Sequence, residues 1–150
     1  MRESFVRTAR VEASPARVWE VLHDTNLLSS LSSHLGAVRV VEPGRAWEVS
    51  LKDRVGVLTL SAPMQVEILE ETDEATISVR AFGQDRGPGT RLIVEATIRL
   101  DQTDAGTELN MSGWFELIGK VAMLGAGVAR RQAGKMIDEF WSNLTKGLQT

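Results

Sequence analysis

The periodic segment near the C-terminus most limits the folds that this chain can adopt. From Ala129 onward, apolar residues recur at three- and four-residue spacing: Ala129, Ala133, Met136, Ile137, Phe140, Leu144 and Leu148. Charged and amide side chains occupy the remaining arc, which is the pattern of an amphipathic α-helix. Such a helix needs a second apolar surface to cover its stripe. We therefore expect it to lie across a sheet formed by residues between 35 and 117.

The middle of the chain alternates apolar and polar residues, as half-buried β-strands do. The clearest alternation runs from Leu58 to Ile68, and Pro63 within it predicts an edge position or a bulge. Four further segments alternate in the same way, residues 47–53, 76–81, 92–100 and 109–116. Because short turns separate them, these segments predict an antiparallel meander with one dry face.

One strand and two short helices are predicted before this meander. Residues 2–12 indicate a strand, and Ser14 followed by Pro15 is a helix-start signal, since serine caps free amides and proline fits the first helical position. A second short helix is expected over residues 26–31 and a strand over residues 38–42. The order predicts one α+β domain over residues 1–150, with a curved seven-stranded antiparallel sheet around the long C-terminal helix.

Composition excludes several classes of function. A net charge of −3 argues against a nucleic-acid partner, which would need a strongly basic face. The absence of cysteine excludes disulfides, thiolate metal sites and cysteine nucleophiles. No uncharged run approaches the roughly 20 residues of a membrane span, and the N-terminal residues lack the apolar core of a signal peptide. We expect a cytoplasmic protein.

The dry face of the predicted sheet lacks groups for acid–base or nucleophilic chemistry. Outside the strands, His23 and His34 are weak candidates for a catalytic residue. Two separated histidines also make a poor metal site, so we predict neither a catalytic residue nor a bound metal. Small residues near the strand middles leave room for an apolar ligand pocket of roughly 300–1,000 Å³. They would equally let a bent sheet approach the helix closely. The predicted pocket residues are Trp47, Leu60, Ala62, Met64, Val79, Val94, Ala96, Met111, Gly113, Phe115, Met136 and Phe140.

Residues 121–129 are apolar nearly all round, which is unusual for a surface helix. One interpretation, which we favour, is a bend at Gly125 to Gly127 that lets both arcs be buried. The other is that the outer arc meets a membrane surface or a protein partner, with flanking positive charge assisting. That contact would be made by Val121, Leu124, Val128, Arg130 and Arg131.

Several motifs resemble known families. The opening Ala13-Ser14-Pro15-Ala16-Arg17-Val18-Trp19 looks like the entry to the first helix in the START and plant pathogenesis-related superfamily, which has the helix-grip fold. More specifically, three segments and Phe140 resemble the CoxG family of proteins that accompany carbon monoxide dehydrogenase: Gly106-Thr107-Glu108-Leu109, Gly119-Lys120-Val121-Ala122-Met123-Leu124-Gly125 and Ala133-Gly134-Lys135-Met136. The chain has His34-Leu35-Gly36 where that family usually has Leu-Pro-Gly, so the cavity mouth is expected to differ.

The CoxG resemblance implies a non-enzymatic accessory protein of molybdenum-containing hydroxylases, often at the cytoplasmic membrane face. It implies a bound quinone-like or lipid-like molecule in the grip cavity and no covalent cofactor. Two alternatives remain open. The first is an enzyme similar to the polyketide cyclases, with His34 or Arg80 at the cavity mouth. The second is an interaction module with a filled core, acting through outward residues such as Trp114 or Trp141.

Overall fold

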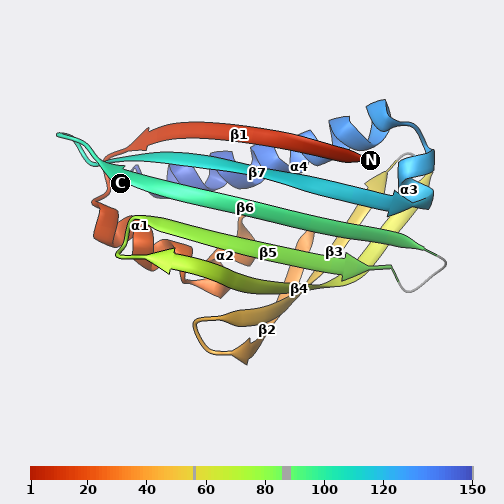
Figure 1. The fold of residues 1–150 in the computed structure, drawn as a ribbon, viewed down its shortest axis with the longest axis horizontal. Helices are drawn as coiled ribbons and strands as arrows, with labels where there is room; N and C mark the ends of the chain where they lie inside the picture. The colour runs from red at the N-terminus through yellow and green to blue at the C-terminus, as the bar shows by residue number, and fades with distance from the viewer. Residues whose placement is uncertain (56, 86–88, 150) are drawn as a thin grey trace.

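The computed structural model describes residues 1–55, 57–85 and 89–149, and shows a curved sheet with a long helix along one side (Figure 1). The elements follow in the order β1 (Arg2–Val11), α1 (Pro15–Leu22), α2 (Thr25–Ser30), β2 (Leu35–Glu42), β3 (Ala46–Val55), β4 (Leu58–Thr72), β5 (Thr76–Gln84), β6 (Thr90–Gln102), β7 (Thr107–Gly119), α3 (Lys120–Met123) and α4 (Ala126–Gly147). The predicted α+β helix-grip architecture is confirmed.

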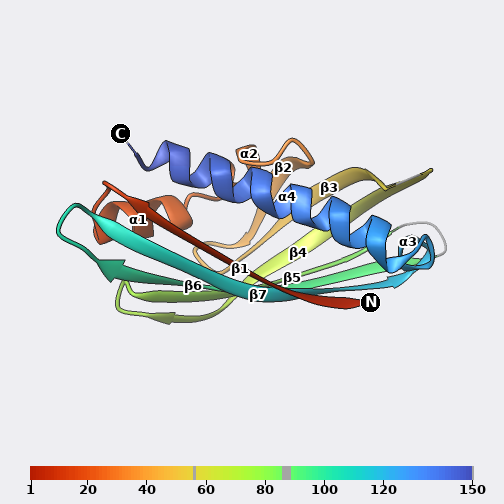
Figure 2. The ribbon, with the colours of Figure 1, turned by 90° about the horizontal axis from the view of Figure 1, so that it is seen from above.

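The sheet is an antiparallel meander from β2 to β7, and β1 pairs with β7 at its far edge. Its seven strands lie in the order β1-β7-β6-β5-β4-β3-β2, and every neighbouring pair is antiparallel. Figure 2 shows α4 running along one face of this sheet, with α1 and α2 at the end nearer the C-terminus. The strands therefore bury one face against α4, and the alternation in the sequence follows from this one-sided burial.

The helix-start signals work as predicted. Ser14 Oγ accepts a hydrogen bond from the Arg17 N–H at 3.2 Å, and Pro15 occupies the first helical position of α1. Asp24 caps α2 in the same way, accepting from the Leu27 N–H at 3.1 Å. Each cap satisfies an amide that the helix itself leaves without a partner.

Pro63 lies where β4 has only one paired neighbour. It pairs with Ser50 of β3, whereas the register with β5 begins one residue later, at Met64 opposite Gly83. Proline has no N–H to donate, so its place just outside the β4–β5 ladder breaks no bond of that ladder.

The predicted C-terminal helix is divided in two. Helix α3 ends before Leu124, and Gly125, with φ of +108°, turns the chain into α4. A positive φ is readily adopted only by glycine, which explains the residue at this bend. The bend lets Val121 turn inward, where it is 2% exposed, and this agrees with the burial interpretation for that residue.

Buried side chains form three clusters rather than one continuous core. The largest gathers α1, the ends of β4 to β7, Trp141 and Leu144 of α4, and Leu148 just after this helix. Trp141 is 8% exposed, so the expectation that it faces outward is wrong. It lies one turn beyond Ile137 on the same apolar stripe, and α1 covers that end of the helix. Among the described helices, none combines the length and the hydropathy needed to cross a membrane.

Candidate functional site

Between the sheet and α4, side chains leave a cavity of about 110 Å³. Strands β1, β3, β4, β6 and β7 contribute one wall, and α3 with the N-terminal half of α4 contributes the other. The lining residues are Phe5, Leu51, Asp53, Val55, Leu60, Leu92, Val94, Phe115, Leu117, Val121, Ala129, Gln132, Ala133, Met136 and Ile137. All except Asp53 and Gln132 are apolar, so the cavity suits a hydrophobic molecule.

The predicted pocket residues divide between this cavity and the packed clusters beside it. Those that line the cavity are Leu60, Val94, Phe115 and Met136. Those in or against the cluster near α1 are Trp47, Val79, Ala96, Met111 and Phe140. Met64 and Ala62 are buried on β4, outside the cavity lining. Alternation places all these residues on one face, but only the path of α4 decides where along that face space remains.

Gly113 does not provide free space, contrary to the prediction. A Cβ at this position would lie 2.2 Å from the backbone oxygen of Glu95 and 2.8 Å from Phe5 Cζ. Phe5 pairs with Gly113 across the β1–β7 ladder, and its ring covers the glycine from the cavity side. An aromatic ring opposite a strand glycine fills the space that the glycine leaves. The sequence contains both residues, but their pairing depends on the register.

Asp53 places a buried carboxylate in the cavity wall. Its side chain is 3% exposed, and it accepts hydrogen bonds from the Arg54 N–H at 2.7 Å and from Gln132 Nε2 at 3.0 and 3.1 Å. His34 Nδ1 lies 3.2 Å from Asp53 Oδ1. The expectation of an inner face without a titratable group is therefore wrong. The signal was present, because Asp53 continues the inward alternation of Val49 and Leu51 in β3.

Ion pairs fasten α4 to the β1 edge of the sheet. Arg130 Nη2 lies 2.6 Å from Glu3 Oε1, and Arg7 Nη2 lies 2.9 Å from Asp138 Oδ1. Glu3, Phe5 and Arg7 are alternate residues of β1 and therefore lie on its inner face. Arg130 is thus engaged within the fold rather than free for a partner.

The loop between α2 and β2 fastens the opposite side of α4. Ser33 N–H donates to Glu139 Oε1 at 2.5 Å, and Asn143 Nδ2 donates to the Leu31 carbonyl oxygen at 2.8 Å. The Gln132–Asp53 contact continues this row along the helix. Polar contacts therefore hold α4 on both sides of the apolar cavity.

The Ser33–Glu139 bond makes part of the stability depend on pH. The backbone N–H of Ser33 holds the pKa of Glu139 below its ordinary value of 4.5. A pKa depressed by folding stabilises the fold above about pH 4.5, and this contribution is lost as the pH falls through the folded pKa. We expect Glu139→Gln to lower the free energy of unfolding near pH 7, and to lower it by less near pH 3. Urea unfolding at both pH values measures it.

Glu12→Gln is the matched control, because Glu12 is exposed and makes no hydrogen bond in the described chain. It should change stability little at either pH. A loss for Glu139→Gln that is equal at both pH values would contradict the assignment of this effect to the carboxylate.

Residues 2–149 match the family model described as polyketide cyclase / dehydrase and lipid transport. The protein belongs to this family. The match covers nearly the whole chain and agrees with the predicted superfamily, while the narrower resemblance to the CoxG family stays a prediction. The family description names enzymes and lipid transport together, and both imply an apolar small molecule.

Solved structures share the fold at low sequence identity. A conserved protein from Geobacillus kaustophilus is 18% identical, with a TM-score of 0.82, over 99% of this chain and 95% of its own. A protein from Helicobacter pylori is 12% identical, with a TM-score of 0.68, over 99% and 88%. A protein from Chromobacterium violaceum is 14% identical, with a TM-score of 0.66, over 98% of each chain. No curated protein matches this polyketide cyclase-like chain.

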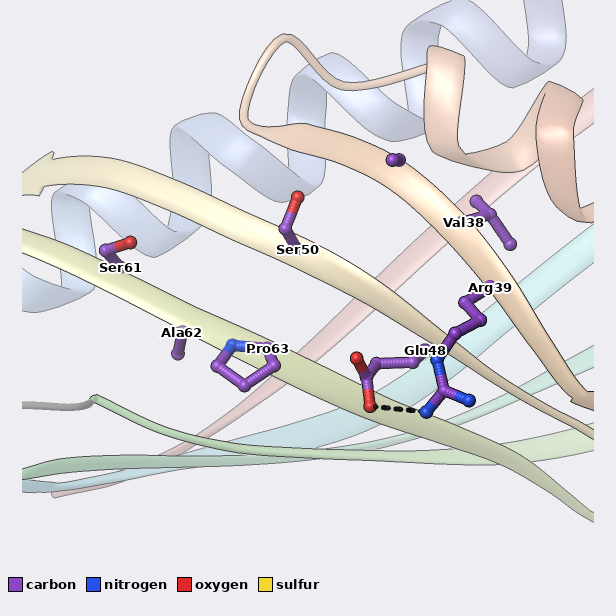
Figure 3. Close-up of a pocket in the computed structure, with 8 residues that line it drawn as sticks. Val38, Arg39, Glu48, Ser50, Ser61, Ala62 and Pro63 are labelled. Atoms are coloured by element: carbon purple, nitrogen blue, oxygen red, sulfur yellow. Dashed lines mark hydrogen bonds and ion pairs between the residues drawn. The ribbon is translucent and has the colours of Figure 1, made fainter.

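A second hollow, of about 440 Å³, lies on the outer side of β2, β3 and β4 (Figure 3). It forms where the register between β2 and β3 shifts between Leu35 and Val38. Its lining includes two hydroxyl side chains, Ser50 and Ser61, and the Arg39–Glu48 ion pair at 3.3 Å. This hollow carries charged and hydroxyl side chains and faces away from α4, so the apolar cavity beneath α4 is the better candidate for the hydrophobic ligand of a member of this family.

The predicted membrane or partner segment is partly engaged inside the protein. Val121 is buried in the cavity wall and so is not offered to a partner, whereas Leu124 is half-buried against its neighbours. Val128, at 37% exposure, and Arg131 remain on the surface. Met123, at 84% exposure, is the most exposed apolar residue of the segment and was not predicted.

Proposed function

We propose that this protein binds and carries a hydrophobic small molecule between its sheet and α4. The observation that carries this proposal is the almost wholly apolar lining of the cavity beneath α4. Burial of apolar ligand surface would supply the affinity, at roughly 25 cal/mol per Å² removed from water. The only polar residues described in this lining are Asp53 and Gln132, so it offers few groups that could hold a polar molecule.

The cavity must expand to admit such a ligand. At about 110 Å³ it is smaller than the roughly 150 Å³ that an engineered apolar cavity uses to bind benzene. Two lining residues of α4 favour expansion: Met136 is an adaptable side chain, and Ala133 is small. The carrier therefore requires α4 to move outward as the ligand enters.

Filling the cavity tests the proposal. We expect Ala133→Leu to raise the free energy of unfolding by about 1 kcal/mol, because it fills apolar space, and to weaken 2-naphthol binding by about tenfold or more because the ligand competes for that space. Calorimetric titration and urea unfolding measure the two effects. Ala16→Leu, on the exposed face of α1, is the matched control and should leave binding unchanged. Equal binding by wild type and Ala133→Leu would place the ligand elsewhere.

From the CoxG resemblance we further propose that the ligand is quinone-like or lipid-like. We also propose that the protein is an accessory protein of a molybdenum-containing hydroxylase. Native mass spectrometry with lipid extraction, on protein purified from its own host, tests this. A co-purified quinone supports the carrier, and a co-purified apolar molecule of another class contradicts the quinone version alone.

A peripheral contact with the cytoplasmic membrane face would use the exposed part of the α3–α4 segment. Met123, Val128 and Arg131 provide two apolar side chains and a positive charge there. In flotation at low salt, the wild type should rise with anionic vesicles, and Met123→Glu should stay in the lower fraction. Absence of wild-type flotation would remove the membrane proposal and leave the carrier proposal intact.

One observation favours an enzyme as the second candidate. His34 Nδ1 faces two acceptors, Asp53 Oδ1 at 3.2 Å and the Lys52 carbonyl oxygen at 3.3 Å, so Nδ1 is the donor and Nε2 points away from this pair. A carboxylate-oriented histidine is a general-base arrangement. His34 does not line the cavity, so the carrier is the stronger proposal. Turnover of a polyketide substrate that His34→Ala abolishes would reverse this order.

A further inference from the structure

Two apolar side chains project into solvent from one end of the molecule. Val57, directly before β4, is 83% exposed, and Met123 in α3 is 84% exposed. They are the most exposed of the large apolar side chains that the structure describes. Figures 1 and 2 place the start of β4 and α3 at the same end, opposite the C-terminus. A single exposed apolar residue is ordinary, so the position of this pair relative to the cavity decides its meaning.

The cavity beneath α4 reaches the same end of the molecule. Its lining includes Val55, the last residue of β3, and Val121 in α3. The opposite end of the interior is filled by the cluster that packs Trp141 against α1. A ligand that left the cavity toward α1 would have to displace closely packed core side chains. The end that carries the two exposed residues is therefore the easier way out.

Apolar contacts close the interior at this end. We call the boundary between residues 54–55 and 57–60 on one side and α3 on the other the seam. Val55 and Val121 belong to one apolar cluster, against which Leu58 packs. In the described part of the chain, no hydrogen bond or ion pair joins the two sides of the seam. The long sides of α4 differ, because ion pairs and hydrogen bonds fasten them to the sheet. Since lipid chains are as apolar as these side chains, a bilayer can replace the contacts of the seam.

Four basic side chains lie at this end of the molecule. They are Arg54 near the end of β3, Arg91 near the start of β6, Lys120 at the start of α3 and Arg131 in the N-terminal half of α4. All four are exposed, and within the described residues none of their side chains makes a hydrogen bond or an ion pair. Positive charge that the fold leaves unpaired favours a negatively charged partner.

Negative charge lies on the turns at the opposite end. These turns carry the exposed acidic residues Glu12, Asp73, Glu74 and Asp104. The whole chain has a net charge of −3, so the basic end departs from the overall charge rather than following from it. This separation of charge orients the molecule with the seam toward a negatively charged surface and with the acidic turns away from it.

The form of the basic end favours a lipid surface over a protein partner. Val57 and Met123 are single projections from separate elements, whereas a stable protein interface buries a broad complementary patch. A lipid surface accepts separate apolar side chains flanked by positive charge. We propose that this end docks on an anionic lipid surface, with Val57 and Met123 entering it on the two sides of the seam, and that the hydrophobic ligand passes through the seam between bilayer and cavity. This inference rests on the proposed carrier function and adds the source of the ligand and its entry route.

A polarity-sensitive fluorophore tests the docking. The chain has no cysteine, so a single introduced cysteine can be labelled with nitrobenzoxadiazole. With phosphatidylglycerol vesicles at low salt, we expect the emission from labels on Val57→Cys and Met123→Cys to rise and shift to shorter wavelength. A label on Asp104→Cys, at the opposite end, is the control and should not respond. Salt at about 1 M, where the Debye length is about 3 Å, should reverse the response.

Transfer of diphenylhexatriene, a slim apolar fluorophore, between phosphatidylglycerol vesicles tests the route. The wild type should accelerate the transfer, and Val57→Glu and Met123→Glu should each slow it by about tenfold, because a charged side chain resists entry into an apolar layer. Both variants should bind 2-naphthol in solution as the wild type does, since neither residue is among the described lining of the cavity. Val6→Glu is the matched control, because Val6 is 66% exposed on the outer face of β1, and it should leave the transfer unchanged.

The outcomes separate this inference from the function on which it rests. If the wild type binds 2-naphthol but the labels on Val57→Cys and Met123→Cys respond to vesicles no more than the label on Asp104→Cys, docking by this end is wrong and the carrier proposal stands. Transfer that both glutamate variants leave unchanged would overturn the route through the seam. Labels that respond as expected on a protein that neither binds 2-naphthol nor transfers diphenylhexatriene would contradict the carrier proposal and the route, and leave the docking.

Discussion

Replacing Trp141 with alanine is expected to lower the free energy of unfolding by about 3–5 kcal/mol, the range for removing a buried large aromatic side chain. Trp141 is 8% exposed and belongs to the cluster that joins α4 to α1 and to the ends of β4–β7. Its loss would leave a cavity at the end of α4 where the neighbouring Leu144 is 1% exposed. Urea unfolding measures the effect.

Trp114 provides the matched control. It lies on the outer face of β7, with the Arg2 guanidinium 3.8 Å from its ring centroid. We expect Trp114→Ala to lower the free energy of unfolding by about 1 kcal/mol or less, because a partly exposed cation–π contact contributes little. Equal losses for the two variants would contradict the assignment of Trp141 to the core.

The second large effect is expected at Gly113. A leucine there would drive its Cβ against the Glu95 carbonyl oxygen and the Ala96 Cα, which are backbone atoms of β6 and cannot rotate away. We expect Gly113→Leu to lower the free energy of unfolding by about 3 kcal/mol or more, since overpacking that moves backbone exceeds the usual cost. Thermal and urea unfolding measure it. Gly113→Ala should already destabilise the protein, because the clash begins at Cβ.

Gly134→Ala is the control, and it is expected to change the free energy of unfolding in the opposite direction. Nothing lies within 4 Å of a Cβ built at Gly134, which is inside α4. Alanine is favoured over glycine in a helix by about 0.8–1.0 kcal/mol, so Gly134→Ala should stabilise the protein. Stabilisation by Gly113→Ala would contradict the close approach of β6 and β7 and reopen the prediction of free space at that position.

Most elements of the fold could be predicted because each is encoded locally. The alternation of β4 and β6 follows from burial of one sheet face, and the stripe of α4 follows from burial of one helix arc. Ser14 and Pro15 marked the start of α1 through bonds that span three residues. The bend at Gly125 was predictable because residues 121–129 were apolar on both arcs.

The site was predictable only in part. Alternation and helical spacing assign Leu60, Val94, Phe115 and Met136 to the inner face, and these four residues line the candidate cavity. Phe5 and Gln132 were missed because their roles depend on partners far along the chain, Gly113 and Asp53. Asp53 could have been assigned to the inner face by continuing the alternation of buried residues in β3 beyond Leu51.

The sequence by itself determined the face of each strand and helix that is buried, because periodicity and local capping require only neighbouring residues. Only the tertiary structure decided where that buried face is filled and where it is hollow. The ring of Phe5 over Gly113 and the pairing of Asp53 with Gln132 join residues far apart in the chain, through strand register and through the line that α4 takes across the sheet. Close packing depends on such distant partners, and no local pattern in a chain specifies them.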